Sequence, residues 1–177
     1  KVSILILSNK LDFTTDYVCI ELLRRGISFL RLNRDEFSNY RITLDVLTGI
    51  MKIELSGQTY VIDETTLKSI YYRAPIYLRD VYRPGISEQE QLFRTQWTAF
   101  IRNLAIYEKA IWVNNPVATF RAENKLLQLR YAHKIGMLCP NTVITNSNTM
   151  QFSNQKDYIV KTLDTAVLRI DDKEAFI

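Results

Sequence analysis

The chain has 177 residues, of which 47% are hydrophobic and 24% are charged, with a formal net charge of +4. This balance is typical of a globular protein and argues against a disordered or fibrous one. The Lys and Arg residues form no block of five or six like charges, and no apolar run approaches the ~18 residues that cross a bilayer, so we expect neither a nucleic-acid nor a membrane partner.

The chain opens with a pattern that predicts two parallel strands joined by a helix. Residues 2–7 are a continuous apolar run, typical of a strand that is buried on both faces. Residues 13–25 predict a helix that ends at Gly26, and residues 27–33 predict the second strand. This order predicts a right-handed crossover. The apolar face of the helix is expected to hold Tyr17, Ile20 and Leu22 or Leu23.

Alternating residues follow in three short segments, 40–47, 51–57 and 59–63, with glycine-containing turns between them. They predict an antiparallel meander that is added to the same sheet. Residues 67–75, LKSIYYRAP, predict a returning strand that ends at Pro75.

A loop at residues 76–85 precedes a long predicted helix, from Ser87 to about Glu108, which starts with Ser87 and Glu90 in capping-box spacing. Its apolar positions recur at intervals of three and four: Leu92, Phe93, Trp97, Phe100, Ile101 and Leu104. A buried strand is predicted at residues 110–115. Residues 1–115 thus predict an α/β domain, with a mainly parallel sheet, flanking helices and a ligand edge at the carboxyl ends of the strands.

The remaining residues, 116–177, predict the start of a second domain. Pro116 opens a helical turn, and a helix is predicted at residues 122–136, with Gly136 as its left-handed end and Leu126, Leu129 and Ala132 or His133 on its inner face. Strands are predicted at 139–146, at 158–162 and at 166–171, the last two as a hairpin. Because the chain stops on an apolar pair, we expect it to be the front part of a longer protein.

Cysteine and histidine suggest no chemistry of their own. Cys19 and Cys139 lie far apart and fit no metal or redox spacing, so we expect two buried thiols and a reducing, cytoplasmic compartment. The chain has a single histidine, His133, and no G-x-S-x-G motif, so we exclude a Ser-His-Asp catalytic site.

One stretch carries a more specific signal. AENKLLQLRYAHKIGMLCPNTVITN, residues 122–146, is followed by YIVKT at residues 158–162, and together they resemble the start of the ATP-grasp central domain. IYYRAP at residues 70–75 and WVNNP at residues 112–116 make the chain similar to the ATP-grasp peptide maturases that produce graspetides, including the microviridin ligases. The resemblance covers a pre-ATP-grasp domain at residues 1–115 and an incomplete nucleotide-binding domain at residues 116–177.

The resemblance implies ATP and Mg²⁺ as cofactors, with Lys125 and Lys161 on the nucleotide phosphates. Phosphoryl transfer depends on positioning and on neutralising charge, for which lysine is a suitable point charge. The alternative is that both are solvated surface lysines. Family members usually have a glycine-rich loop after the second lysine, whereas residues 161–172 contain no glycine, and Thr162 and Thr165 would take that place. The Mg²⁺ ligands are expected beyond Ile177, so the chain has no predicted metal ligand or catalytic residue.

Arginines after the predicted strand at residues 67–75 are the candidates for substrate binding. Arg73, followed by Arg79 and Arg83, is expected to bind a substrate carboxylate, because a guanidinium fork matches a carboxylate. The alternative is three solvated loop arginines. The nearby tyrosines are expected to pack in the core and loops rather than to stack on bases or a peptide: Tyr71, Tyr72, Tyr77 and Tyr82.

Two functions remain open. The first is an ATP-dependent ligase that modifies a ribosomally made precursor peptide through an acyl phosphate and forms ester or amide cross-links. The second is a non-catalytic, pre-ATP-grasp-like module for peptide binding or dimerisation. We also expect a possible homodimer, and we expect residues 1–177 alone to be inactive.

Overall fold

The computed structural model describes residues 1–73, 85–147, 157–159, 167–170 and 173–176. The chain divides into two compact units, Lys1–Thr119 and Phe120–Ile177. In the described part of the chain, every helix is too short or too polar to pass through a lipid bilayer.

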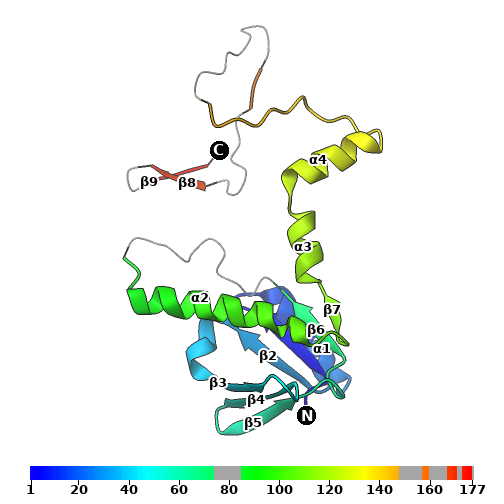
Figure 1. The fold of residues 1–177 in the computed structure, drawn as a ribbon, viewed down its shortest axis with the longest axis vertical. Helices are drawn as coiled ribbons and strands as arrows, with labels where there is room; N and C mark the ends of the chain where they lie inside the picture. The colour runs from blue at the N-terminus through cyan, green and yellow to red at the C-terminus, as the bar shows by residue number, and fades with distance from the viewer. Residues whose placement is uncertain (74–84, 148–156, 160–166, 171–172, 177) are drawn as a thin grey trace. The chain divides into compact units, whose positions relative to one another are not determined.

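A four-stranded parallel sheet with the order β2-β1-β6-β7 forms the centre of the first unit (Figure 1). The strands are β1 (Ile4–Ser8), β2 (Phe29–Asn33), β6 (Ser69–Tyr72) and β7 (Ile111–Val113). Successive residues of β1, namely Leu5, Ile6 and Leu7, are fully buried, because both faces of this central strand are covered. The predicted α/β class with a mainly parallel sheet is confirmed.

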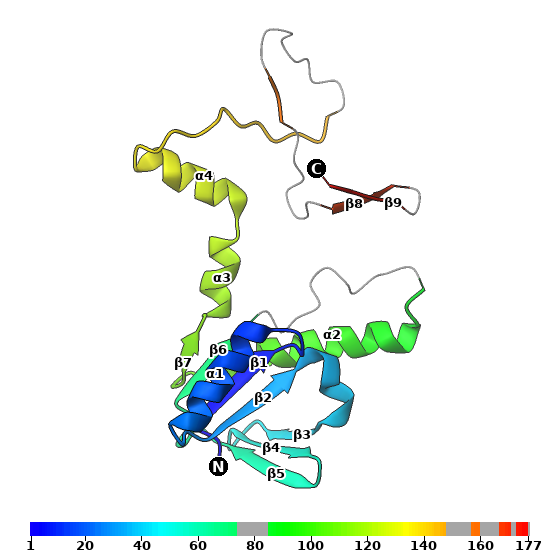
Figure 2. The ribbon, with the colours of Figure 1, turned by 180° about the vertical axis from the view of Figure 1, so that it is seen from behind.

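Helix α1 (Phe13–Arg24) connects β1 to β2 and covers one face of this sheet (Figure 2). The Asp12 carboxylate caps its start by accepting the Thr15 N–H at 3.3 Å. Its end is a Schellman motif, in which the N–H groups of Gly26 and Ile27 donate to carbonyls of the last turn, both at 3.0 Å. Gly26 has a φ of 62°, as the sequence predicted for the end of this helix.

Helix α2 (Glu88–Asn103) lies on the opposite face of the sheet (Figures 1 and 2). The Ser87 hydroxyl accepts the Glu90 N–H at 3.2 Å, but the Glu90 carboxylate pairs with Arg94 at 2.7 Å. The helix ends earlier than predicted, and a 3₁₀ helix, η2 (Leu104–Ile106), follows it. Leu92, predicted to face inward, is exposed because it lies two and a half turns before the buried Ile101, on the other side of the helix.

The predicted meander is present, but the prediction that it joins the parallel sheet was wrong. Strands β3 (Arg41–Asp45), β4 (Ile50–Leu55) and β5 (Gln58–Ile62) form a separate antiparallel sheet with the order β3-β4-β5. Met51 and Ile53 are buried, whereas Lys52 and Glu54 between them are exposed. Because only one face of β4 is apolar, this sheet packs as an outer layer and not within the parallel sheet.

One hydrophobic cluster joins these layers. The 3₁₀ helix η1 (Arg34–Asn39), which follows β2, adds Phe37, whose ring centroid lies 4.3 Å from that of Trp97 on α2. The buried members include Leu5, Leu7, Leu30, Leu32, Ile70, Met51, Ile53, Ile62, Trp97, Ile101 and Leu104. Ile6 is also buried but lies outside this cluster. The cluster holds the strands of both sheets in place, and with them the loops at their ends.

After β7 the chain forms α3 (Pro116–Ala122) and α4 (Lys125–Lys134). Side-chain oxygens of Asn115 and Asn124 accept N–H groups at the start of these helices, at 2.9 Å to Val117 and to Leu127 respectively. The sequence predicted a single helix at residues 122–136, whereas the structure begins it only after the Asn124 cap. Gly136 ends it with a φ of 83°, as predicted.

Strand predictions in the second unit were partly wrong. Residues 139–146 form no strand. Of the strand predicted at residues 158–162, residues 160–162 lie outside the described residues, and residues 158 and 159 are not assigned to a strand. Strand β8 (Val167–Ile170) was predicted, but it pairs with an unpredicted strand, β9 (Lys173–Phe176). A strand needs a partner for its backbone N–H and C=O groups, and apolar alternation alone does not specify that partner.

Candidate functional site

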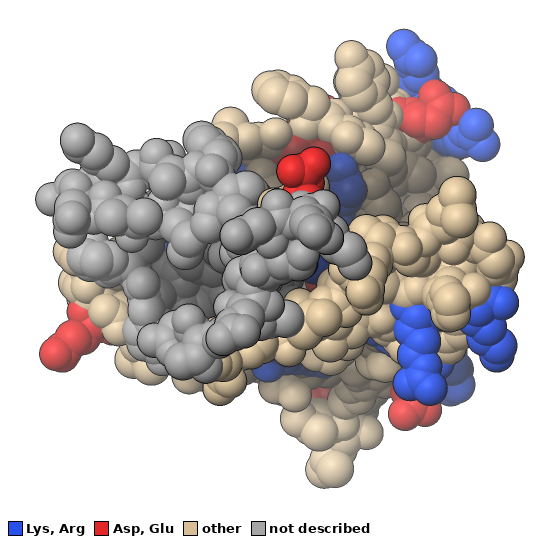
Figure 3. All heavy atoms as spheres, turned by 90° about the horizontal axis from the view of Figure 1, so that it is seen from above, with Lys and Arg blue, Asp and Glu red and all other residues tan. Residues whose placement is uncertain are grey.

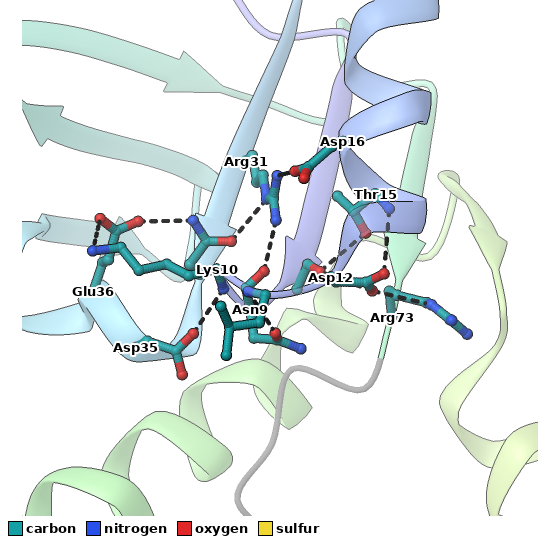
Figure 4. Close-up of polar contacts among 12 residues, drawn as sticks. Asn9, Lys10, Asp12, Thr15, Asp16, Arg31, Asp35, Glu36 and Arg73 are labelled. Carbon is teal, nitrogen blue, oxygen red and sulfur yellow. Dashed lines mark hydrogen bonds and ion pairs between the residues drawn. The ribbon is translucent and has the colours of Figure 1, made fainter.

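The strand order of the parallel sheet reverses between β1 and β6. From β1 the chain passes through α1 to β2 on one side, whereas β6 pairs with the other side of β1 and leads to α2 on the opposite face. In open α/β sheets, ligands bind outside the carboxyl ends of the strands at such a point. The loop after β1 and the first residue after β6, Arg73, meet there (Figure 4).

Asp12 is the centre of this meeting point. Its carboxylate accepts hydrogen bonds from the Thr15 N–H at 3.3 Å, from the Ser8 hydroxyl at 3.2 Å and from Arg73 Nε–H at 3.1 Å. The hydroxyls of Ser8 and Thr15, both buried, lie 3.0 Å apart. Three elements, β1, α1 and β6, thus converge on one carboxylate.

The charge state of Asp12 follows from these contacts. Burial raises the pKa of the Asp12 carboxyl. The hydrogen bonds from Thr15, the positive charge of Arg73 and the hydrogen bond from Ser8 outweigh this effect, so the pKa lies below its ordinary value. Asp12 is therefore an anion that orients Arg73 and also caps α1.

Arg73 uses only part of its guanidinium in this pair. Its backbone N–H donates to the Leu7 carbonyl at 2.9 Å, which fixes the start of the side chain. Among the described residues, Asp12 is the only ion-pair partner of Arg73, and it is contacted by Nε. The Arg73 side chain is 46% exposed, whereas that of Asp12 is 10% exposed. Figure 4 shows the terminal nitrogens of Arg73 pointing away from Asp12, where they can donate to an anion.

A second polar group, centred on Arg31, lies beside the Asp12–Arg73 pair and supports the loop after β1. Arg31 on β2 donates to the Asn9 carbonyl at 2.6 Å and to the Asn33 side-chain oxygen at 2.8 Å, and it pairs with Asp16 on α1. These contacts use all three nitrogens of the guanidinium, so we assign Arg31 a structural role.

The loops after β1 and β2 are held together by carboxylates. The backbone N–H of Lys10 donates to Asp35 at 2.7 Å, and its ammonium lies 3.0 Å from Glu36. The Asn33 amide donates to Glu36 at 2.7 Å. This bond and the nearby Lys10 outweigh burial and lower the pKa of Glu36. Lys10 is thereby engaged, which leaves Arg73 as the better candidate for binding an anion.

The other predicted site residues lie in the second unit or outside the described residues. Lys125 is the first residue of α4 and is exposed. Lys161, Arg79, Arg83, Thr162 and Thr165 lie outside the residues that the structure describes, as do Tyr77 and Tyr82. Of the two remaining tyrosines, Tyr72 is buried and Tyr71 is half-buried, as expected for packing.

Residues that could hold a metal do not gather in the described part of the chain, where no group of three His, Cys, Asp or Glu side chains has a suitable arrangement. The two cysteines are free and half-buried, so the expectation that both are buried was only partly right. His133 is exposed. On the face drawn in Figure 3, both Lys or Arg and Asp or Glu side chains are visible.

Three of the site residues were missed by the sequence analysis: Ser8, Asp12 and Thr15. A signal was present, because Asp12 directly precedes a predicted helix and Thr15 stands three residues later, the spacing of an N-cap and its N–H donor. Nothing local indicates that the same carboxylate also binds Arg73.

The structure is similar to solved ATP-grasp ligases, although no protein-family model and no curated protein matches the chain. With the macrocyclase MdnC of Microcystis aeruginosa MRC, bound to its precursor peptide MdnA, the TM-score is 0.77 at 19% identity, over 99% of this chain and 60% of that one. With the macrocyclase MdnB of the same organism, the TM-score is 0.61 at 23% identity, over 82% and 48%.

A third similar structure is the RiPP-associated ATP-grasp ligase of Chryseobacterium gregarium, in complex with ADP and a leader and core peptide. Its TM-score is 0.60 at 20% identity, over 100% of this chain and 55% of that one. The present chain thus spans about half the length of these proteins. Over that length it has the fold of the ATP-grasp peptide maturases, as the resemblance in the sequence implied.

Proposed function

We propose that this chain is the N-terminal part of an ATP-dependent ligase that modifies a ribosomally made precursor peptide. The support is a fold shared with macrocyclases and ligases that bind precursor or leader and core peptides. The observation that carries the proposal for this chain's own residues is the Asp12–Arg73 pair at the reversal of strand order.

The proposed reaction has two steps. A side-chain carboxylate of the peptide attacks the γ-phosphorus of ATP, which releases ADP and leaves an acyl phosphate. A Ser or Thr hydroxyl or a Lys amine then attacks the acyl carbon, phosphate leaves, and the nucleophile loses a proton. The product is an ester or an amide cross-link, with a net loss of one water from the peptide.

Arg73 is proposed to hold a carboxylate of the peptide. Its two terminal amino groups form a fork that matches the two oxygens of a carboxylate, and Asp12 limits the rotation of that fork by holding Nε at 3.1 Å. Because Asp12 is itself fixed by Ser8 and Thr15, the fork is oriented before the substrate arrives. Such preorganisation lowers the entropic cost of binding.

The nucleotide is proposed to contact Lys125 and Lys161 through its phosphates. Lys125 fits this role, because it is exposed in the first turn of α4, where backbone N–H groups and the helix dipole favour a negative charge. Mg²⁺, when bound, would neutralise the phosphate oxygens during transfer. We propose that its ligands come from other residues of the full-length ligase.

The test separates nucleotide binding from peptide modification in the full-length ligase. Lys125→Met should weaken the binding of ADP, because a charge-assisted contact is worth about 1.5–3 kcal/mol, or roughly ten- to a hundredfold. Arg73→Met should leave ADP binding unchanged and reduce peptide modification by a similar factor. Calorimetry measures the first quantity, and mass spectrometry, through the loss of water from the peptide, measures the second.

Matched controls remove equivalent charges elsewhere. Lys134→Met changes the other end of α4, and Arg41→Met changes an exposed arginine on β3. Neither control should affect binding or modification. If Lys125→Met and Arg73→Met both behave like their controls, the ligase assignment of these residues is wrong and a non-catalytic binding module becomes the better interpretation.

A further inference from the structure

The guanidinium of Arg73 lies beside a carboxylate that is held in place. The side chain of Asp12 is 10% exposed, and its oxygens accept hydrogen bonds from the Thr15 N–H at 3.3 Å, from the Ser8 hydroxyl at 3.2 Å and from Arg73 Nε–H at 3.1 Å. A carboxylate on the open surface can rotate away from an approaching anion, whereas Asp12 is fixed by groups from three elements. Its negative charge therefore stays beside any anion that Arg73 binds.

Asp12 also keeps its charge. Burial raises the pKa of its carboxyl, but the hydrogen bonds from Thr15 and the positive charge of Arg73 outweigh this effect, so Asp12 is ionised at neutral pH. Water and salt screen a nearly buried charge less than an exposed one. The carboxylate of Asp16, which is 43% exposed, is screened more strongly. Asp12 is thus the carboxylate of this site whose charge acts most directly on a bound anion.

Cations and anions are balanced around this edge of the parallel sheet. Basic side chains there each pair with an acidic one: Lys10 with Glu36, Arg31 with Asp16, Arg34 with Asp35, and Arg73 with Asp12. The pairs of Lys10, Arg31 and Arg73 are drawn in Figure 4. Because these side chains have no net charge together, an anion is attracted by the hydrogen bonds of Arg73 and not by a wider positive field.

A site of this kind distinguishes anions by their charge. A carboxylate carries one negative charge, which the guanidinium fork of Arg73 neutralises, whereas a phosphate group carries about 1.5 to 2 at neutral pH. The additional charge of a phosphate gains no second unpaired cation among the eight side chains of these ion pairs, and it is repelled by Asp12. For a unit charge several ångströms away near a protein surface, Coulomb's law gives a repulsion that corresponds to roughly tenfold in affinity.

We propose that Asp12 is a specificity-determining residue, which makes the Arg73 fork select a carboxylate over a phosphate group. This inference rests on the proposed function, in which Arg73 holds a carboxylate of the peptide. A guanidinium fork matches phosphate as well as carboxylate, so an arginine without such a neighbour would also bind ATP, ADP or free phosphate. It follows that Arg73 holds the peptide carboxylate before its phosphorylation and not after it.

The test compares the binding of acetate and of methyl phosphate to residues 1–177. NMR follows the Cζ signal of Arg73, which Arg73→Lys identifies by removing it, and chloride at matched ionic strength is the reference. In Asp12→Asn, the affinity for methyl phosphate relative to acetate should rise roughly tenfold above the wild-type ratio. Asparagine is a good N-cap, so this variant loses the charge and keeps the start of α1. Asp12→Ser repeats the measurement with a second uncharged cap.

The ratio of the two affinities separates charge selection from a structural role, because a loosened Arg73 would bind both anions more weakly. Asp45→Asn is the matched control: Asp45 also accepts two backbone N–H groups, at 2.9 and 3.0 Å, but it belongs to the second sheet, and the ratio should not change.

Three results would overturn the proposal. An unchanged ratio in both Asp12 variants, with acetate still bound at Arg73, would reject the selection and leave the carboxylate role of Arg73 intact. A ratio that rises equally in Asp45→Asn would show a general effect of net charge. If acetate does not shift the Arg73 signal of the wild type, both the selection and the proposed carboxylate role are wrong.

Discussion

Two buried tyrosines differ in what their hydroxyl groups contact. Tyr40 accepts the backbone N–H of Asn33 at 3.0 Å and also hydrogen bonds to Glu36. The Tyr107 hydroxyl, by contrast, is buried without a hydrogen-bond partner among the described residues. Burial is the main cause that raises the pKa of each to about 12, so both are neutral at any physiological pH.

We predict opposite effects when each tyrosine is changed to phenylalanine. Tyr107→Phe should stabilise the fold by about 1 kcal/mol, because it removes a buried polar group that has lost its water. Tyr40→Phe should destabilise it by about 1 kcal/mol, because the Asn33 N–H is left without its acceptor. The free energy of unfolding in urea measures both. Equal effects of the two changes would contradict this account of the buried hydroxyls.

At the scale of the element, the end of α1 decides where β2 begins. Gly26 has a φ of 62°, and a Cβ built at this position meets no atom within 4 Å. A substitution there is therefore opposed by the backbone conformation alone. The Schellman bonds of Gly26 and Ile27 turn the chain from α1 into β2, whose last residue, Asn33, supports the loop beside the candidate site.

We predict that Gly26→Ala destabilises the protein by about 1 kcal/mol, since alanine adopts a left-handed conformation only at that cost. Gly26→Asn is the matched comparison and should cost less, because asparagine tolerates this conformation better. Thermal unfolding measures the order of stability of the wild type and the two variants. An alanine variant as stable as the wild type would show that this backbone conformation is not retained in solution.

At the scale of the whole molecule, the chain spans about half the length of the similar ligases. We predict that residues 1–177 alone do not turn over ATP in the presence of Mg²⁺. The reason is that phosphoryl transfer needs Mg²⁺ ligands and several phosphate contacts in one site. Of these groups, we propose only the two lysines, Lys125 and Lys161, in this chain. A coupled ADP-release assay measures turnover, with the full-length ligase as the positive control. If residues 1–177 turn over ATP faster than their Lys125→Met variant does, the proposal that the Mg²⁺ ligands lie elsewhere in the full-length ligase is wrong.

The sequence by itself determined the α-helices and strands of the first unit, though not its two 3₁₀ helices, and one member of the candidate site. Apolar runs, alternation and end signals such as Ser87 and Gly26 act between near neighbours, so they can be interpreted without the fold. Arg73 was found in the same way, from its place after a predicted strand. The two lysines and the extent of the second domain stay predictions.

Only the tertiary structure decided which elements contact one another. It separated the meander from the parallel sheet, it left Tyr17 and Leu23 of α1 exposed among the described residues of their own unit, and it joined Asp12 to Arg73 across 61 positions. The physical reason is that periodicity specifies which face of an element is apolar but not what will pack on it. Contacts between distant residues arise when the whole core is assembled, and the candidate site consists of such contacts.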